Sequence, residues 1–151
     1  MIARYRLPEM EKIWSDENRF QQMLQVELYV CEAMKDMGQL DKETYDDIVA
    51  KAGFDLQRIK EIESVTRHDV AAFFAAVSER IGEENAKKLH WGITASDLVD
   101  TSMAVQMRQA VDLIIGKLYQ LRDVLAELAK EHKYTLMVGR THCEHAEPMS
   151  F

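Results

Sequence analysis

The sequence predicts an all-α fold, in which a small helical N-terminal domain is followed by one long helix of a central helical bundle. Three observations lead to this prediction. The 151 residues include only six glycines and two prolines, so few positions favour turns. Apolar residues recur at helical spacings of three and four along most of the chain. From Ser96 to about Lys133 there is one glycine and no proline, which allows a single helix over that whole stretch.

The first elements are predicted from their start and stop signals. Ser15 or Asp16 can cap a helix that runs to about Gly38, because both side chains can accept a hydrogen bond from a backbone amide of the first turn. Two shorter helices are expected near residues 42–51 and 56–64.

The first of these helices carries an apolar stripe with one ionisable residue in it. Glu27 lies on the stripe, and a buried carboxylate needs a partner that compensates for lost hydration. We therefore expect a buried partner for Glu27. The apolar members of the stripe are Phe20, Met23, Leu24, Val30, Cys31 and Met34.

Two short segments share a threonine followed three residues later by an aspartate, which is typical of a capping box. T-R-H-D at residues 66–69 predicts a helix that begins at Thr66 and ends at Gly82, and T-A-S-D at residues 94–97 predicts the start of the long helix. Both segments can be plain helix caps. The pattern alone favours plain caps. Free amides at a helix N-terminus also attract anions, so the alternative is that both segments are sites for carboxylate or phosphate, with Arg140 as a further cation.

The long helix carries a heptad seam of roughly four heptads on a helix of ~55 Å. Further apolar residues lie outside the seam, and a helix with more than one apolar stripe is typical of a bundle interior. This chain supplies no second long helix, so we expect the bundle to form between subunits. The seam consists of Ala104, Met107, Val111, Ile114, Leu118, Leu121, Leu125 and Leu128.

The C-terminal stretch predicts a short extended segment, Y-T-L-M-V-G-R, that leads into a polar loop, T-H-C-E-H. His142, Cys143 and His145 could ligate zinc, but the second pair of ligands that zinc sites usually have is missing. Proton transfer by a histidine is the more plausible chemistry, because imidazole titrates near neutral pH. His90, beside Trp91, could be a ligand-binding residue or simply a packed ring.

Composition and charge exclude several classes of protein. The net charge of −7 disfavours binding to nucleic acid or to anionic membranes, both of which require clustered cations. Two cysteines, Cys31 and Cys143, are too few for a disulfide framework, and no apolar run is long enough to span a bilayer. With no signal peptide visible, a cytoplasmic location is expected.

Five segments together resemble the adenylosuccinate lyase family of the fumarase/aspartase superfamily. They are R-Y-R-L-P-E-M-E-K-I-W, D-E-N-R-F-Q-Q-M-L-Q-V-E, T-R-H-D-V-A-A-F, H-W-G-I-T-A-S-D-L-V-D-T and G-R-T-H-C-E-H-A-E-P-M-S-F. Their order and spacing match the family's N-terminal third over the whole chain. The opening segment is the most specific of the five, whereas the last two are shared with other members of the superfamily.

The resemblance implies a β-elimination without a cofactor or a metal. This family releases fumarate from adenylosuccinate to give AMP, and from the succinylated aminoimidazole carboxamide ribotide in purine nucleotide (IMP) biosynthesis. A base removes a proton from the succinyl β-carbon, and an acid protonates the departing nitrogen. Another superfamily lyase, such as argininosuccinate lyase, and a non-catalytic helical oligomerisation module are the alternatives.

Site residues follow from the resemblance, position by position. His142 matches the general acid, and His68 matches a second catalytic histidine that contacts the substrate. Substrate-binding positions include Arg4 and Tyr5 for the nucleotide and Thr94 and Ser96 near the succinyl carboxylates. The remaining matched positions are Arg67, Asp69 and His90.

The chain also departs from the family pattern. Ala95 stands where the family usually has a serine, and Cys143 stands where it usually has glycine. The family's serine- and lysine-bearing loop, which supplies the base, is absent from these 151 residues. In this family each site is assembled from three subunits of a homotetramer.

The resemblance therefore implies an N-terminal segment with a helical domain at residues 1–93 and the start of the central bundle at residues 94–151. We expect this segment alone to be inactive and to self-associate through its long helix.

Overall fold

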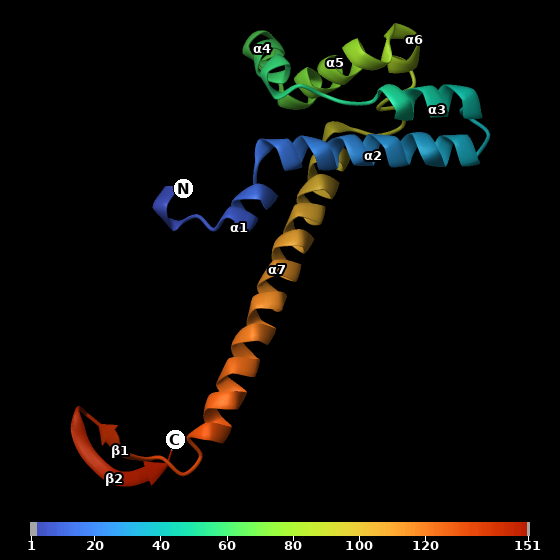
Figure 1. Cartoon of the computed structure of the whole chain (residues 1–151). Coiled ribbons are helices and arrows are strands. Elements are labelled where there is room, and N and C mark those ends of the chain that lie inside the picture. Colours follow the sequence, from blue (N-terminus) through green and yellow to red (C-terminus); the bar gives the residue numbers. More distant parts are fainter. Residues whose placement is uncertain (1–2, 151) are drawn as a thin grey trace. The chain divides into compact units, whose positions relative to one another are not determined.

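The computed structural model describes residues 3–150, which fall into two compact units divided between Ala110 and Val111 (Figure 1). The first unit holds η1 (Ala3–Tyr5), α1 (Pro8–Ile13), α2 (Asp16–Asp36), α3 (Lys42–Lys51), α4 (Leu56–Thr66), α5 (Asp69–Ile81), α6 (Glu83–Ala86) and the start of α7 (Ala95–Glu131). The second unit holds the rest of α7, β1 (Leu136–Thr141) and β2 (Glu144–Ser150). The all-α class is confirmed, with the small sheet as an addition. The domain boundary after residue 93 stays a prediction.

Side-chain caps begin four of the helices in the first unit, α2, α3, α4 and α5. Ser15 Oγ accepts from the Asn18 amide at 3.1 Å and begins α2, as predicted. Asp41 Oδ1 accepts from the Thr44 amide and begins α3, and Asp55 Oδ1 accepts from the Arg58 amide and begins α4, each at 2.8 Å. The helices predicted near residues 42–51 and 56–64 are therefore confirmed, the second with two more residues.

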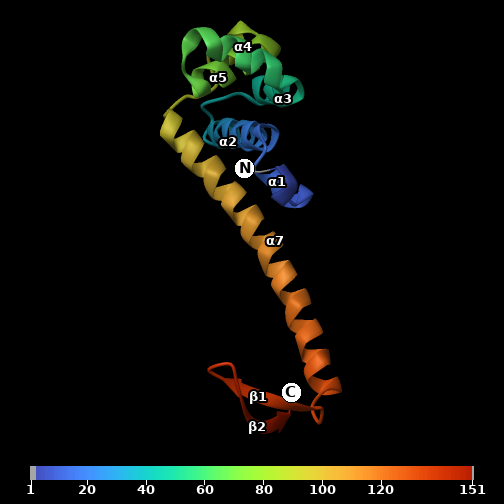
Figure 2. The ribbon, with the colours of Figure 1, turned by 90° about the vertical axis from the view of Figure 1, so that its left-hand side faces the viewer.

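The hydrophobic core lies between the helices of the first unit, and the apolar stripe of α2 forms one wall of it. Figure 1 shows α2 and α3 side by side, and Figure 2 shows the same helices after a quarter turn. Phe20 stacks on Phe73 with ring centroids 5.6 Å apart. Glu27 is buried together with the stripe residues Phe20, Met23, Leu24, Cys31 and Met34. Val30, the remaining member of the stripe, is only partly buried.

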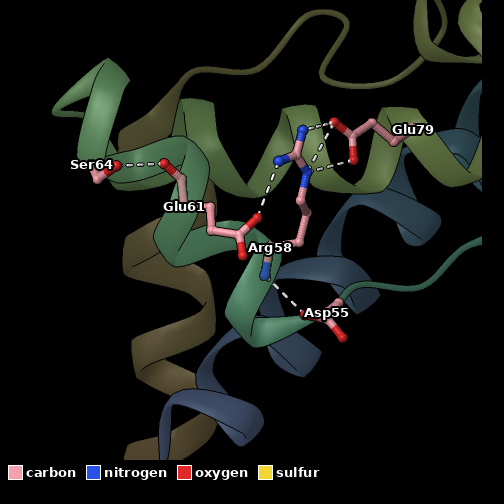
Figure 3. A network of polar contacts seen from close by, with 5 residues as sticks. All are labelled: Asp55, Arg58, Glu61, Ser64 and Glu79. Carbon is pink, nitrogen blue, oxygen red and sulfur yellow. Dashed lines mark hydrogen bonds and ion pairs between the residues drawn. The ribbon is translucent and has the colours of Figure 1, made fainter.

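A polar network joins α4 to α5 on the surface of this unit (Figure 3). The Arg58 guanidinium donates to both carboxylate oxygens of Glu79, with Nε–Oε2 at 2.9 Å and Nη2–Oε1 at 2.6 Å. Arg58 Nη1 also donates to Glu61 Oε2 at 3.2 Å. The hydrogen bonds from Arg58 hold the pKa of Glu79 below its usual value.

The predicted start of α5 at Thr66 is wrong. Thr66 is the last residue of α4, and Arg67 follows in the left-handed region with φ 56°. His68 is extended, and its carbonyl accepts the first hydrogen bond of α5 from Ala72 N at 3.0 Å. Only Arg67 and His68 separate α4 from α5. Because Thr66 still belongs to α4, the residue that caps α5 is His68. The predicted end at Gly82, with φ 88°, is confirmed.

The first part of α7 packs into the first unit through one face, which is not the heptad seam. Leu98, Ser102, Gln106 and Ala110 are buried on this face, and Gln106 Nε2 donates to the Ile13 carbonyl at 2.8 Å. The seam is exposed, and its large side chains have exposed fractions from 38% at Leu128 to 55% at Met107 and Leu118. In the described part of the chain, no helix is long and apolar enough to cross a membrane.

The second unit contains an antiparallel hairpin in which β1 pairs with β2. Val138 faces Pro148 and Arg140 faces His145, so one residue of β1 lies opposite two residues of β2, which is a β-bulge. His142 and Cys143 connect the strands with φ 50° and 65°. The extended segment is confirmed. The loop predicted for T-H-C-E-H is wrong at Thr141, which ends β1, and at Glu144 and His145, which begin β2. Strand pairing extends to the two-residue turn of His142 and Cys143.

Candidate active site

His68 is held by its own helix. Its Nδ1 accepts from the Ala71 amide at 3.3 Å, which makes the side chain the cap of α5. An accepting Nδ1 places the hydrogen of the neutral ring on Nε2. The exposed imidazole can therefore present an N–H donor to an anionic ligand.

Asp69 is fixed from two sides beside this histidine. Its Oδ1 accepts from the Val70 amide at 2.8 Å, and its Oδ2 accepts from Arg19 Nη1 of α2 at 3.1 Å. Arg19 also lies over the ring of Phe20, with Cζ 4.3 Å from the centroid. The side chain of Arg67 is exposed next to them. Helix α2 thus anchors the start of α5, a contact that the sequence motif could not reveal.

The start of α5 does not provide free amides for an anion at Val70 and Ala71. Asp69 and His68 occupy these two amides, so the helix-cap interpretation of T-R-H-D is confirmed, with His68 in the role expected of Thr66. An anionic group here would have to be bound by the side chains of Arg67 and His68 instead.

His90 is bound to the buried carboxylate of Glu27. Its backbone N–H donates to Glu27 Oε2 at 2.9 Å, and its ring Nδ1 lies 2.7 Å from Glu27 Oε1. The ring also packs against Phe74, with centroids 6.0 Å apart. The partner that Glu27 was expected to need is therefore His90, and the packed-ring interpretation of His90 is correct as well.

Glu27 also affects Cys31, which lies one turn further along α2. Burial, with a smaller contribution from the Glu27 carboxylate, raises the pKa of the Cys31 thiol to about 11. This cysteine stays protonated at neutral pH and acts as a core residue.

Arg4 and Tyr5 lie together in η1. Arg4 Nη2 donates to the Tyr5 hydroxyl at 3.1 Å, and the guanidinium lies over the Tyr5 ring at 4.9 Å from its centroid. Both side chains are exposed, so a cation and an aromatic face are presented side by side. This pairing suits a nucleotide, which has both a phosphate and a π system.

Thr94 and Ser96 lie at the start of α7, and both are exposed. The Thr94 N–H donates to Asp97 Oδ2 at 2.9 Å, which is the acidic half of the predicted capping box. Helix α7 begins at Ala95, the position that departs from the family pattern.

His142 lies in the second unit, at the tip of the hairpin, and is exposed there. It shares the turn with Cys143 at positive φ, a conformation that glycine adopts without steric cost. This explains physically why the family usually has glycine after this histidine. Among residues 3–150, no three His, Cys, Asp or Glu side chains are grouped in a way that could hold a metal ion.

Two partners of the candidate residues, Glu27 and Arg19, were not among the predicted site residues. The sequence did signal Glu27, as a carboxylate on an apolar stripe. Arg19 carries no such signal, because an arginine near a helix start is common and its contact with Asp69 spans 50 positions.

A family model described as Lyase matches residues 3–151. The chain is 51% identical over its 151 residues to the adenylosuccinate lyase of Bacillus subtilis (strain 168). It is 46% identical to the enzyme of that name from Synechocystis sp.. The resemblance stated from the motifs is thereby confirmed. The chain spans 35% of the length of each of these curated relatives.

Solved structures show the same fold. A fumarate lyase from Mesorhizobium sp. BNC1 superposes with a TM-score of 0.86 at 28% identity, over 94% of this chain and 34% of that one. A 3-carboxy-cis,cis-muconate lactonizing enzyme from Pseudomonas putida superposes with a TM-score of 0.87 at 30% identity, over 98% of this chain and 35% of that one. Since the family model covers nearly every residue, the chain belongs to this lyase family.

Proposed function

We propose that this chain is part of an adenylosuccinate lyase, a carbon–nitrogen lyase of purine biosynthesis. The enzyme would release fumarate from adenylosuccinate to give AMP, and from the succinylated aminoimidazole carboxamide ribotide. The observation that carries the proposal is the 46–51% identity, over the whole chain, to relatives that bear this name.

In this proposal His142 is the general acid. An exposed imidazole at the tip of a hairpin can reach a bound substrate. It can protonate the departing nitrogen as the bond between that nitrogen and the succinyl α-carbon breaks. His68 supports the reaction from the start of α5, where its Nε2–H can donate to the substrate. The base that takes the β-proton would come from the serine-bearing loop of the family, which these residues do not include.

The remaining predicted residues would bind substrate. Arg4 and Tyr5 would contact the nucleotide, and Thr94 and Ser96 would donate hydroxyl hydrogen bonds to the succinyl carboxylates. Additional polar contacts would come from Arg67, Asp69 and His90.

The complete enzyme would be a cytoplasmic homotetramer whose subunits join along the helical bundle. The exposed heptad seam of α7 supports this, since such a seam is stable in water only when it is covered. The domain organisation proposed above, with the bundle starting at residue 94, fits the same assembly. The 151-residue chain would then self-associate through α7 but release no fumarate by itself.

The experiment is a fumarate-release assay on a complete lyase chain that carries this segment. The variant His142→Asn removes the acid, while asparagine tolerates the positive φ of the turn. We expect kcat/KM to fall by at least about 10²-fold, which is the lower range for a general acid.

The matched control is His145→Asn, which changes a second exposed histidine of the same hairpin and should retain most of the activity. Full activity of His142→Asn would contradict the proposal that His142 is the general acid. No fumarate from either substrate would contradict the proposed function itself.

A further inference from the structure

The carboxylate of Glu27 is buried in the helical core, and the reaction proposed above does not use it. Only 1% of the residue is exposed, and its neighbours on the stripe of α2 are apolar. A buried carboxylate is costly unless hydrogen bonds replace its hydration. The hydrogen-bond partners of Glu27 therefore indicate the role of this carboxylate.

Both oxygens of Glu27 meet the same residue. Oε2 accepts from the backbone N–H of His90 at 2.9 Å, and Oε1 lies 2.7 Å from its ring Nδ1, across 63 positions of sequence. His90 has φ 57°, an uncommon conformation for a residue with a Cβ. Glu27 thus holds the backbone of His90 in a strained conformation and fixes its ring at the same time.

The pair exposes the imidazole and hides the acid. The side chain of His90 keeps 26% of its surface exposed, compared with 2% for Glu27. Phe74 packs against the ring from α5, so the imidazole is held from two directions. Only the ring, and not the carboxylate, is available to a ligand.

We propose that Glu27 is a positioning residue, which fixes the ring orientation and the tautomer of His90 for substrate binding. An ionised carboxylate only accepts hydrogen bonds, so the hydrogen of the neutral ring lies on Nδ1 and the lone pair on Nε2. This is the opposite of His68, whose Nδ1 accepts. The two histidines therefore offer a substrate opposite groups at Nε2, an acceptor from neutral His90 and a donor from His68.

The first test measures the tautomer directly, by nitrogen NMR of the 151-residue chain labelled at histidine. The variant His90→Asn identifies the His90 signals, and asparagine tolerates the positive φ. We expect a hydrogen on Nδ1 and none on Nε2 at a pH where the ring is neutral.

The variant Glu27→Gln is nearly isosteric and should reverse this tautomer. Its amide oxygen can still accept from the His90 N–H, while its NH₂ group donates to Nδ1 and leaves the hydrogen on Nε2. An Nε2–H tautomer in the unchanged chain, or an unchanged tautomer in Glu27→Gln, would overturn the proposal. Matching amide spectra of the two chains establish that the variant is folded.

The second test is kinetic and rests on the proposed function. In a complete lyase chain, Glu27→Gln should lower kcat/KM on the order of 10²-fold, the effect of a misplaced binding group. If Glu27 acts only through His90, the same change in a His90→Asn background should have no further effect.

The outcomes separate the two proposals. Equal losses from Glu27→Gln in both backgrounds would show that Glu27 acts independently of His90 and would overturn the positioning role. A complete chain without lyase activity would contradict the proposed function, while the NMR result would still decide the tautomer.

Discussion

His68 and His90 use the same ring atom, Nδ1, in opposite roles. His68 accepts from a backbone amide of its own helix, so the orientation of its ring is set by a local contact. His90 meets a carboxylate from a different helix, so its position depends on the packing of α2 against the segment before α7. A substitution in the core of α2 should therefore disturb His90 more than His68.

The ion pair of Arg58 and Glu79 leads to a prediction about pH. Glu79 has a pKa below its usual 4.5 because Arg58 donates to it, so the pair stabilises the fold above about pH 4.5. This contribution is lost as the pH falls through the lowered pKa. In Glu79→Gln, we expect the free energy of unfolding to fall less steeply as the pH drops below about 5.

Chemical denaturation at several pH values measures this slope. Glu131→Gln, at an exposed glutamate of α7, controls for the loss of one carboxylate. Equal slopes for Glu79→Gln and the unchanged chain would contradict the assignment.

At the scale of elements, the junction of α4 and α5 shows how a correct signal can be misplaced. T-R-H-D does contain a helix start, but the preceding helix continues through Thr66 and excludes that residue as the cap. The left-handed Arg67 then turns the chain, and His68 becomes the first residue able to cap. Capping patterns describe four residues and contain nothing about where the previous helix ends.

The hairpin turn leads to a prediction about Cys143. A residue with a Cβ in the left-handed region loses about 1 kcal/mol or more relative to glycine. Cys143→Gly should therefore stabilise the hairpin by roughly 1 kcal/mol, which slows amide exchange in β1 and β2 about fivefold.

Cys143→Ala is the matched control, because it removes the thiol and keeps the Cβ. It should leave the exchange rates nearly unchanged. Equal effects of alanine and glycine would attribute the change to the thiol and not to the backbone.

At the scale of the whole molecule, the main feature is the exposed seam of α7. The face of α7 that packs on the first unit ends at Ala110, whereas the seam continues to Leu128. Its apolar side chains are partners for another helix, and a second copy of this chain carries the same seam.

We therefore expect the 151-residue chain to self-associate, with an average mass in sedimentation that rises with concentration. Leu118→Gln with Leu125→Gln should shift the chain toward the monomer, because both changes remove apolar seam surface. Lys117→Gln with Asp123→Asn changes polar positions of the same helix and serves as the control. A monomer at every concentration would contradict the expectation.

The sequence by itself determined α2, α3, α4, the end of α5 and the long span of α7, because the signals for these are local. Ser15 caps α2, Gly82 ends α5, and the spacing of three and four defines both the stripe of α2 and the seam of α7. It also determined that Glu27 needed a partner, since a carboxylate on a buried stripe has few alternatives.

Only the tertiary structure decided which residue that partner is. His90 reaches Glu27 across 63 positions, and Arg19 reaches Asp69 across 50, through the packing of helices against one another. Contacts of this kind depend on how the helices pack in three dimensions, which a pattern of neighbouring residues does not encode. The cap at His68 was likewise decided by a neighbouring element, because α4 continues through Thr66. The strand that contains His145 was decided by its hydrogen bonds with β1.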